Sequence, residues 1–491
     1  MTLVFSSTDF KYELESVVKL FLPAQLFKIV IAPSENGIDD DICFVKSEKG
    51  AVFTSLYVFC RIGDKITQEA GIILNSTPNY ESECEMALAR YLYKCLQELT
   101  GKQAEWGIIT GIRPVKQINS MVSHGLSEKE IRKNLAEKFL CSEKKIDTAF
   151  AVAQAQKRAL KTLRRNSFSL YISIPFCPSR CSYCSFVSQS VESCLNLIPE
   201  YVTNLCAEIR YTANIMSKLG IKLDTIYFGG GTPTSLEASY LTAIMKTIDE
   251  SFDTSAVREY TVEAGRPDTI TADKLTAILK GGASRISINP QTLNDDVLRE
   301  IGRKHTVTDF YEKYVLARSM GFDYINTDLI AGLPTDTIES FRDTIDGMIS
   351  LSPENITVHT LSIKRAADLN QRSRTVIDNT TAEMIDYAST KLSENEYVPY
   401  YLYRQKNMLD NLENIGWAKR GYESFYNIYI MEENQTIIAV GAGGSTKLVN
   451  GLTGDIKRVF NHKFPLEYNK HFDLMLERKQ EIEEFFLGEK K

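Results

Sequence analysis

The chain has 491 residues, of which 43% are hydrophobic and 24% are charged, and its formal net charge at pH 7 is −6. This balance is typical of a soluble globular protein of about two to four domains, and it offers no basic surface for a nucleic acid. No stretch reaches the ~18 consecutive apolar residues of a membrane-spanning helix, and the N-terminus lacks the pattern of a secretory signal. We therefore expect a cytoplasmic protein with no nucleic-acid partner and no membrane span.

Residues 1–165 predict an α+β domain that ends in a helical linker. Several strand-like segments precede a helix over about residues 82–100. A second helix is expected after Ser127, because Ser127 and Glu130 have the spacing of a capping box. The linker helix begins near Lys145. We find no pattern in this region that indicates chemistry.

From residue 166 to about residue 400, strand-like and amphipathic helical segments alternate. The expected strands cover 169–174, 224–228, 258–264, 284–289, 323–330 and 355–361, and the helices between them cover 198–219, 238–252, 272–280, 293–301, 308–320 and 336–350. Six consecutive strand–helix units predict a parallel sheet, which is either an open doubly wound sheet or a partial barrel. In both architectures ligands bind at the carboxyl ends of the strands.

The segments that follow the six strands support this expectation. They read CPSRCSYC, GGGTP, EAGRP, NPQ, DLIAGLP and HTLSIKR. Each one is polar, rich in glycine or rich in cysteine, so the unusual residues converge on one rim of the sheet. The remaining residues, 401–491, predict a C-terminal cap domain, with strands at 425–432 and 436–445 and a helix near 467–487.

Most of the ten cysteines fit structural roles. Some lie on apolar helical stripes, and the others have no partner at the spacing of metal ligands; free cysteine is among the most buried residue types. The seven cysteines that we assign to the core are Cys43, Cys60, Cys84, Cys95, Cys141, Cys194 and Cys206.

The other three cysteines, Cys177, Cys181 and Cys184, have the spacing C-x3-C-x2-C directly after the first strand of the alternating region. Iron–sulfur clusters are held by thiolates, usually four for a cubane cluster. Three thiolates on one loop leave one iron without a protein ligand, and that iron can chelate a small molecule, as an open zinc position binds water or substrate. A closed zinc site is the alternative, and it needs a fourth Cys or His that does not follow nearby.

This cysteine spacing, with an aromatic residue before the last cysteine and GGGTP after the next strand, resembles the radical S-adenosylmethionine superfamily. The segments YISIPFCPSRCSYCSF, IYFGGGTPTSL, VEAGRP, IGRKHT and NTDLIAGLP narrow the resemblance to the oxygen-independent coproporphyrinogen III oxidase group. The long N-terminal region and VGAGGSTK are similar to its longer-chain branch, the coproporphyrinogen dehydrogenases. The resemblance implies an α/β protein with a partial (β/α)6 TIM-like barrel over 166–400, an N-terminal α+β domain and a C-terminal α/β cap.

The resemblance also implies a 4Fe–4S cluster on the three cysteines and one or two bound S-adenosylmethionine molecules. The positions that match contacts to S-adenosylmethionine are Tyr171, Tyr183, Gly230, Gly231, Thr232, Glu263, Gln291, Arg303, Asp328 and, in the C-terminal glycine-rich loop, Lys447. A tetrapyrrole with four propionates needs cations, because guanidinium and ammonium groups pair with carboxylates. The candidates for this role are Lys364, Arg365, Arg404 and Lys406.

The activity that the resemblance implies is oxidative decarboxylation of two propionates of coproporphyrinogen III, giving protoporphyrinogen IX. A low-potential electron donor such as flavodoxin or ferredoxin would reduce the cluster, and a radical derived from S-adenosylmethionine would take hydrogen from the propionate.

Two alternatives remain open. Phe186 stands where oxidases of this group carry an additional cysteine and where a related haem-chaperone branch carries phenylalanine, so the chain is also a candidate haem-binding chaperone. The other alternative is a radical enzyme that modifies or degrades haem. A simple iron–sulfur electron carrier would give GGGTP and the acidic strand ends no role.

Overall fold

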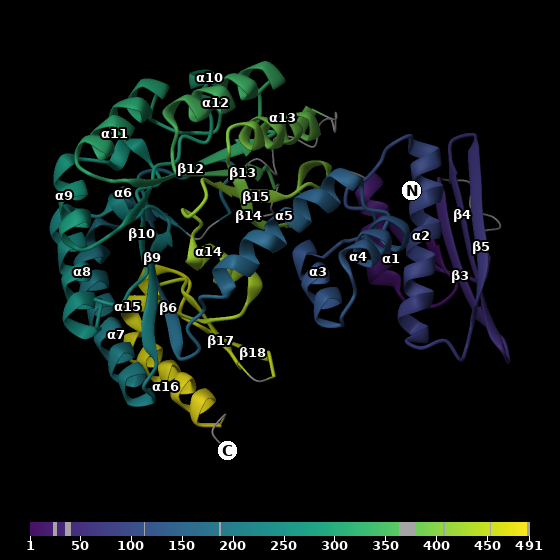
Figure 1. The fold of residues 1–491 in the computed structure, drawn as a ribbon, viewed down its shortest axis with the longest axis horizontal. Coiled ribbons are helices and arrows are strands. Elements are labelled where there is room, and N and C mark those ends of the chain that lie inside the picture. The colour runs from purple at the N-terminus through teal and green to yellow at the C-terminus, as the bar shows by residue number, and fades with distance from the viewer. Residues whose placement is uncertain are drawn as a thin grey trace. The chain divides into compact units, whose positions relative to one another are not determined.

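The computed structural model describes residues 1–22, 27–34, 41–111, 113–185, 188–362, 380–405, 408–451 and 453–488. The described residues form two compact units, whose elements are labelled in Figure 1. The first unit contains Met1–Ala153 and Tyr403–Glu413, and the second contains the described residues from Gln154 to Leu402 and from Asn414 onward. The division into three domains at residues 165 and 400 stays a prediction.

The first unit is an α+β structure, as the sequence predicted. Its sheet has the order β2-β1-β3-β4-β5, in which β1 pairs in parallel with β2 and β3, while β3, β4 and β5 are antiparallel. Side chains of the two long helices and of β4 share one apolar core, which includes Leu88, Leu92 and Val58. The strands are β1 (Thr2–Phe5), β2 (Lys28–Ile31), β3 (Ile42–Lys49), β4 (Phe53–Ile62) and β5 (Lys65–Leu74), and these helices are α1 (Lys11–Phe21) and α2 (Tyr80–Thr100).

Shorter helices follow α2: α3 (Pro114–Ser123), α4 (Glu128–Lys133), a π-helical turn (Asn134–Lys138) and α5 (Glu143–Leu160). The predicted capping box begins α4. The Ser127 hydroxyl accepts from the Glu130 backbone N–H, and the Glu130 carboxylate accepts from the Ser127 backbone N–H at 2.8 Å. These two bonds satisfy donors that the first helical turn leaves without a partner.

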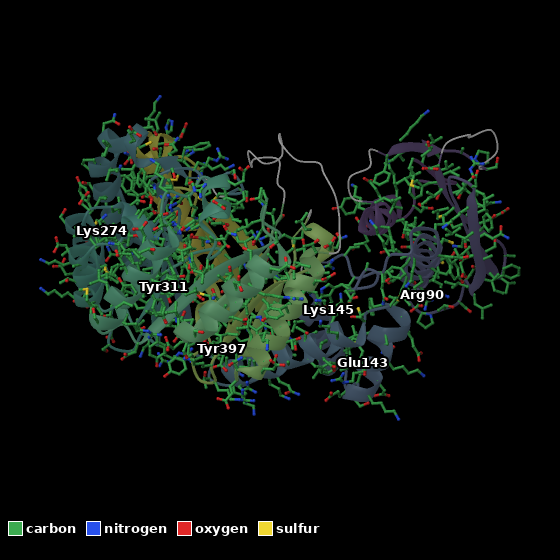
Figure 2. All side chains as sticks on the ribbon, turned by 90° about the horizontal axis from the view of Figure 1, so that it is seen from above. Arg90, Glu143, Lys145, Lys274, Tyr311 and Tyr397 are labelled. Carbon is green, nitrogen blue, oxygen red and sulfur yellow. The ribbon has the colours of Figure 1, made fainter. Side chains whose placement is uncertain are left out.

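Tyr403–Glu413 belongs to the first unit although it lies between two strands of the second. Within that unit the fully buried Glu413 carboxylate pairs with Lys145 Nζ at 2.6 Å (Lys145 is labelled in Figure 2) and accepts from Trp106 Nε1 at 2.7 Å. An ion pair that is removed from water needs such additional hydrogen bonds, so these contacts fix the end of the segment in the unit's interior.

The second unit is built on a sheet of order β14-β15-β13-β12-β11-β10-β9-β6-β16-β17-β18. The six strands from β6 to β13 run in parallel and follow one another in chain order, and β16 extends them in parallel on the other side of β6. These strands are β6 (Ser167–Ile174), β9 (Lys222–Gly230), β10 (Glu259–Glu263), β11 (Arg285–Ser287), β12 (Tyr324–Ala331), β13 (Asn355–Thr360) and β16 (Thr436–Val440).

Consecutive strand order decides between the two architectures that the sequence left open. A doubly wound sheet reverses its order at a switch point and carries helices on both faces, whereas a barrel adds each new strand on the same side. No reversal occurs between β6 and β13, and the connecting helices form the outer arc around the strands (Figure 1). The partial TIM-like barrel is therefore confirmed.

The helices of this arc match the predicted ranges closely. The α7 helix ends at Gly220, which has φ 71° and donates its N–H to the last turn of the helix, a conformation that costs glycine little. The arc contains α7 (Ile198–Leu219), α8 (Ala238–Ser251), α9 (Ala272–Lys280), α10 (Asp295–Glu300), α11 (Val307–Ser319), α12 (Ile338–Leu351) and α13 (Thr380–Glu394).

The residues after 400 continue the same sheet. The additional strands are β14 (Val398–Tyr403), β15 (Asn414–Ala418), β17 (Ser445–Val449) and β18 (Ile456–Phe460), and β13–β15, β16–β17 and β17–β18 pair antiparallel. The expected helix near 467–487 is two helices, α15 (Pro465–Lys470) and α16 (Phe472–Gly488), which are separated at His471.

The strand predicted at 425–432 is wrong, because this segment forms the helix α14 (Phe425–Glu432). Its alternating aromatic and β-branched residues favour a strand, but the Ser424 hydroxyl caps the helix by accepting from the Asn427 backbone N–H. Glu259 at the start of β10 accepts from Ser424 Oγ at 2.8 Å and from the Phe425 N–H at 2.7 Å. These bonds place α14 at the amino end of the barrel strands.

None of the helices among the described residues is long and apolar enough to cross a lipid bilayer.

Candidate metal and cofactor site

The three cysteines of the C-x3-C-x2-C motif lie on the loop that leaves the carboxyl end of β6. This loop begins with the short strand β7 (Phe176–Cys177), and the Cys184 N–H donates to the Cys181 carbonyl at 3.1 Å. Cys181 is buried, whereas Cys177 and Cys184 are partly exposed. The loop therefore presents two accessible thiols and one thiol that the protein surrounds.

Gly231 allows the loop after β9 to approach the first cysteine. A Cβ atom at Gly231 would lie 2.6 Å from the Phe176 carbonyl oxygen, which is closer than real Cβ contacts, and 3.0 Å from Cys177 Sγ, which is tighter than most of them. The neighbouring Thr232 hydroxyl lies 3.4 Å from the same sulfur. Burial raises the pKa of the Cys177 thiol, and the hydrogen bond from Thr232 opposes this effect by favouring the thiolate. GGGTP thus contacts the cysteine loop, as its position one strand later suggested.

Gly230 has φ 106°, a conformation that side chains with a Cβ atom rarely adopt. A Cβ atom there would also meet the backbone of Ile174 at 3.2 Å. Both glycines thus keep the rim between β6 and β9 free of side-chain atoms.

Two buried arginines reach the cysteine loop: Arg266 from the loop after β10, and Arg303 from the loop between α10 and α11. Arg266 donates to Cys181 Sγ at 3.5 Å and forms a two-bond ion pair with Asp268. Arg303 donates to the Tyr183 hydroxyl at 3.0 Å and to the Asn289 carbonyl at 2.7 Å. The rim around the thiols is consequently cationic, which stabilises thiolates.

Two carboxylates belong to the barrel strands: Glu263 ends β10, and Asp328 lies within β12. Glu263 accepts from the Tyr227 hydroxyl at 2.5 Å, and burial raises the pKa of Glu263 to about 7, with Asp328 contributing in the same direction and Tyr227 opposing it. Burial works to raise the pKa of Asp328 too, but hydrogen bonds from His359 and Asn326 hold it below its usual value. Near pH 7 the two carboxylates therefore differ, with Asp328 ionised and Glu263 close to half protonated.

Gln291 lies just beyond β11, where its backbone forms an isolated parallel bridge with Leu329 of β12. Its backbone has φ 72°, its N–H donates to the Asp328 carbonyl at 3.0 Å, and its carbonyl accepts from the Ile330 N–H at 3.0 Å. Among the residues that the structure describes, the buried side-chain oxygen Oε1 has no hydrogen-bond partner. A buried amide oxygen without a partner is costly, so this atom is suited to a ligand donor.

Three tyrosine rings stack inside the barrel. The ring centroids of Tyr227 and Tyr426 are 4.3 Å apart, and the centroid of Tyr171 is 6.2 Å from each of them. The angles between the ring planes are 14° to 19°. Tyr426 comes from α14 and therefore enters the interior from the amino end of the strands. The stack connects that end of the barrel to the Glu263 carboxylate through Tyr227.

The structure brings most of the predicted site residues to this rim, on the loops and strand ends described above: Cys177, Cys181, Cys184, Tyr183, Gly230, Gly231, Thr232, Glu263, Gln291 and Arg303. Tyr171 and Asp328 lie within β6 and β12, three residues before the strand ends at Ile174 and Ala331. Sequence reasoning did not assign Tyr227, Arg266, His359 or Tyr426. A signal existed for Arg266, because EAGRP follows a barrel strand, and for Tyr227, which directly precedes Phe228 and the glycines. Tyr426 had none, since its segment was expected to be a strand.

Lys447 is not brought to the rim. It pairs with Ile437 at the level of Ser169, about 17 Å along the strand from the end of β6 at Ile174. Lys447 Nζ contacts Glu433 at 3.3 Å and the Ile430 carbonyl at 3.0 Å. The glycine-rich loop itself does reach β6, because the Ala442 carbonyl accepts from Ser173 Oγ at 2.7 Å.

Of the four residues predicted to bind propionates, only Arg404 lies within the described residues. Arg404 is buried in the first unit, where its guanidinium donates to the carbonyls of Ile109 and Asn411 and burial lowers its pKa to about 10. These contacts hold the buried guanidinium against backbone carbonyls of the first unit, which does not support the predicted role of Arg404 in binding a propionate. Lys364, Arg365 and Lys406 lie outside the described residues, as does Phe186.

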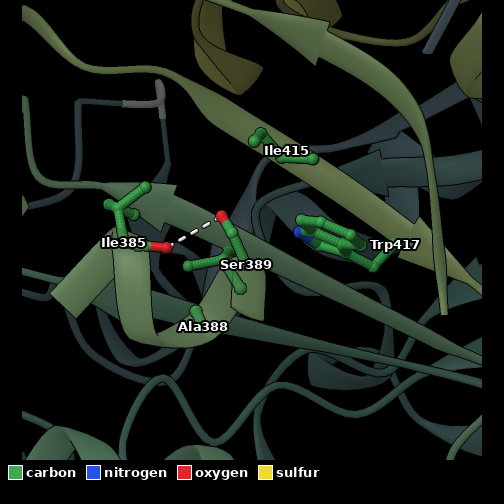
Figure 3. Close-up of a pocket in the computed structure, with 6 residues that line it drawn as sticks. Ile385, Ala388, Ser389, Ile415 and Trp417 are labelled. Atoms are coloured by element: carbon green, nitrogen blue, oxygen red, sulfur yellow. Dashed lines mark hydrogen bonds between the residues drawn. The ribbon is translucent and has the colours of Figure 1, made fainter. Parts of the chain in front are cut away.

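A crevice between α13, β13 and β15 offers no alternative site (Figure 3). It is lined by apolar side chains and by Ser389, whose hydroxyl donates to the Ile385 carbonyl at 2.8 Å. Its empty space of about 160 Å³ does not admit a water-sized sphere, so it is a packing defect.

The geometry also bears on the zinc alternative. Among the described residues, no three candidate ligand side chains converge on one metal ion. A closed zinc site requires such convergence, whereas each thiolate of a cubane cluster binds a different iron. The described thiols thus do not converge as a closed zinc site requires, and the assignment to a cluster rests on the family of the chain.

Comparison with known proteins agrees with this assignment. The family model for the Radical SAM superfamily matches residues 171–347. The chain is 41% identical over 390 residues to the oxygen-independent coproporphyrinogen-III oxidase-like protein HemZ of Bacillus subtilis, covering 78% of each chain. It is 32% identical to the heme chaperone HemW of the same organism, covering 66% of this chain and 83% of that one.

Among solved structures, the coproporphyrinogen III oxidase HemN from Escherichia coli is similar with a TM-score of 0.51 at 22% identity, covering 66% of this chain and 73% of that chain. At this identity the likeness shows the fold.

Proposed function

Because the chain belongs to the radical S-adenosylmethionine superfamily and, within it, to the oxygen-independent coproporphyrinogen III oxidase group, we propose that it decarboxylates propionates of coproporphyrinogen III to vinyl groups. Two such reactions on one molecule give protoporphyrinogen IX. Proteins of this superfamily use a 4Fe–4S cluster and S-adenosylmethionine. When bound, these groups supply the organic radical that removes a hydrogen atom from the substrate.

The residues of the rim fit these groups. Cys177, Cys181 and Cys184 are the thiolates that would hold the cluster. Gly230 and Gly231 leave room for a ligand next to it, since neither contributes a side chain. The proposal depends on both features, because the cluster needs the three thiolates and a ligand beside it needs the space that the two glycines leave.

The polar residues of the interior would position S-adenosylmethionine. Ionised Asp328 and, above about pH 7, Glu263 are acceptors for ribose hydroxyls. The unpartnered Oε1 of Gln291 is an acceptor for a further donor of the ligand. Arg303 is a buried cation suited to a carboxylate.

The observation that carries the proposed reaction is the 41% identity to an oxidase-like protein over 78% of both chains. Each decarboxylation takes one hydrogen atom to 5′-deoxyadenosine, releases CO₂ and transfers one electron from the substrate to an acceptor. A low-potential donor such as flavodoxin or ferredoxin would supply the electron that starts each cycle.

The test is an anaerobic incubation of the reconstituted protein with S-adenosylmethionine, a reductant, an electron acceptor and coproporphyrinogen III. We expect products that have lost one CO₂ and two hydrogens for each propionate, with one 5′-deoxyadenosine per loss. The matched control is the Cys181→Ser variant, which should form neither product. Unchanged porphyrinogen beside 5′-deoxyadenosine would reject the decarboxylation but not the radical chemistry.

A haem chaperone is the second candidate, and it is favoured by Phe186 and by the similarity to HemW. This function predicts stoichiometric haem binding and no 5′-deoxyadenosine release when coproporphyrinogen III is added. Methylated or ring-opened tetrapyrroles in the same mass analysis would instead indicate an enzyme that acts on haem.

A further inference from the structure

Arg266 connects two loops at the rim. It follows β10, is only 3% exposed, and reaches from the loop after β10 to the cysteine loop after β6. Its Nη1 donates to Ser179 Oγ at 3.1 Å, to the Ser179 carbonyl at 3.3 Å and to Cys181 Sγ at 3.5 Å. The Arg266 side chain is therefore hydrogen-bonded both to Ser179 and to the sulfur of Cys181, the second cysteine of the motif.

Asp268 fixes the direction of this side chain. Arg266 Nε donates to Asp268 Oδ1 at 2.9 Å, and Nη2 donates to Oδ2 at 2.8 Å. A planar guanidinium held by two parallel bonds cannot rotate, so its remaining nitrogen stays aimed at the cysteine loop. Lysine has no such fork and would not reproduce the arrangement.

The positive charge of Arg266 acts directly on Cys181 Sγ, because the guanidinium is buried and contacts this sulfur. Hydrogen bonds to cluster sulfurs and nearby positive charge stabilise the reduced cluster, which carries one more negative charge than the oxidised one. Burial weakens the solvent screening that would reduce this effect at the surface. The adjacent His305 adds no charge near pH 7, because burial, with Arg303 in second place, lowers its pKa to about 3.

We propose that Arg266 is a positioning residue that raises the reduction potential of the cluster through Cys181, and that Asp268 aims Arg266 while partly offsetting its charge. The proposal rests on the cluster that the superfamily shares. It does not depend on which tetrapyrrole reaction the protein performs.

The test is a redox titration of the anaerobically reconstituted protein, monitored by electron paramagnetic resonance, without S-adenosylmethionine or porphyrinogen. Arg266→Gln should shift the midpoint potential to a more negative value. Asp268→Asn should shift it to a more positive value. The matched control is Arg180→Gln, which removes an exposed cation next to Cys181 and should shift the potential much less, because solvent screens that charge.

Shifts of opposite sign separate a tuned potential from damage to the loop, because a distorted loop has no reason to respond with the sign of the removed charge. Iron per chain is measured for every variant. Equal shifts in one direction, or no shift with iron retained, would overturn the proposal. If Arg266→Gln assembles no cluster, Asp268→Asn decides alone, and an unchanged or lowered potential would overturn it. Opposite shifts in a protein that leaves coproporphyrinogen III unchanged would retain this inference and reject only the decarboxylation.

Discussion

Both units contain cysteines that lie near one another, but the two groups differ in their exposure to solvent and in the polar and charged side chains beside them. In the first unit Cys60 Sγ lies 3.3 Å from Cys43 Sγ, and both side chains are at most 2% exposed in an apolar core. In the second unit Cys177 is partly exposed beside Thr232, and Cys181 is buried against Arg266. Cys60 and Cys43 are thus hydrogen-bonded to each other in an apolar core, whereas the loop cysteines have a hydroxyl and a guanidinium beside them.

The pKa directions show what this difference does. Hydrogen bonds with Cys43 and Cys95, followed by burial, raise the pKa of Cys60 well above its usual value. Burial also raises the pKa of Cys177, but Thr232 opposes it there. Because the thiolate is the metal ligand, the raised pKa makes Cys60 a poor ligand, whereas the hydroxyl of Thr232 and the guanidinium of Arg266 favour metal binding by the loop cysteines. Metal binding follows from the environment of the thiols more than from their proximity.

The strongest test of this contrast is Cys181→Ser. We expect this variant to lose most of its iron and all cleavage of S-adenosylmethionine, because a cubane cluster with two thiolates is poorly held. Iron analysis and the visible absorbance of the reconstituted protein measure the loss. Cys194→Ser is the control in the same unit; Cys194 is buried and donates to Gln189 Oε1 at 3.0 Å, a bond that serine can keep. Equal iron loss in both variants would contradict the contrast.

The next test alters the approach of the glycine loop to the cysteine loop. Gly231→Ala should lower iron content and destabilise the protein by about 3 kcal/mol, because the new methyl group overlaps the Phe176 carbonyl and Cys177 Sγ. Thermal unfolding under anaerobic conditions and iron analysis report the two effects. At Gly265 a Cβ atom would meet nothing within 4 Å, so Gly265→Ala should change neither. A fully loaded Gly231→Ala protein would show that the close approach is not required.

The same contrast explains what the sequence could predict. The cysteine spacing, GGGTP and the strand–helix alternation are local patterns, and the structure places them as expected. The helix over Phe425–Glu432 depends on Glu259, which lies far away in the sequence and bonds the helix start. The role of Arg266 likewise depends on a contact across two loops. Long-range partners of this kind leave no signal in the local pattern of residues.

Lys447 shows that a local motif can also predict a loop correctly and a side chain incorrectly. Its motif does lie at the rim, since Ala442 contacts Ser173, but antiparallel pairing carries the chain back toward the amino end before Lys447 is reached. The motif therefore predicted the position of the glycine-rich loop but not the position of the Lys447 side chain that follows it.

A smaller effect concerns the Glu263 carboxyl at the end of β10. The folded pKa of Glu263 is about 7, above its ordinary value of 4.5, so the folded protein binds this proton more tightly than the unfolded chain does. The stability that Glu263 contributes is fully present below about pH 4.5 and is lost as the pH rises through about 7. We expect the loss to be about 2 kcal/mol, less than the full shift implies because the side chain is partly exposed.

Glu263→Gln should remove this pH dependence, and thermal unfolding of the metal-free protein between pH 5 and pH 8 measures it. Glu237→Gln is a surface control that should keep the wild-type slope. An unchanged slope in Glu263→Gln would mean that the carboxylate titrates normally.

The smallest expected effect lies in the first unit, where Cys60→Ala tests the inert side of the comparison. Removing the buried sulfur leaves a small cavity between β4 and α2, and we expect a loss of about 1 kcal/mol in stability. Iron content and the midpoint potential of the cluster should stay at the wild-type values, because Cys60 contributes only packing. Thermal unfolding and iron analysis on one preparation measure both quantities. A variant that unfolds normally but loads less iron would assign the core thiols a part in metal handling, and the distinction between the two groups of cysteines would then fail.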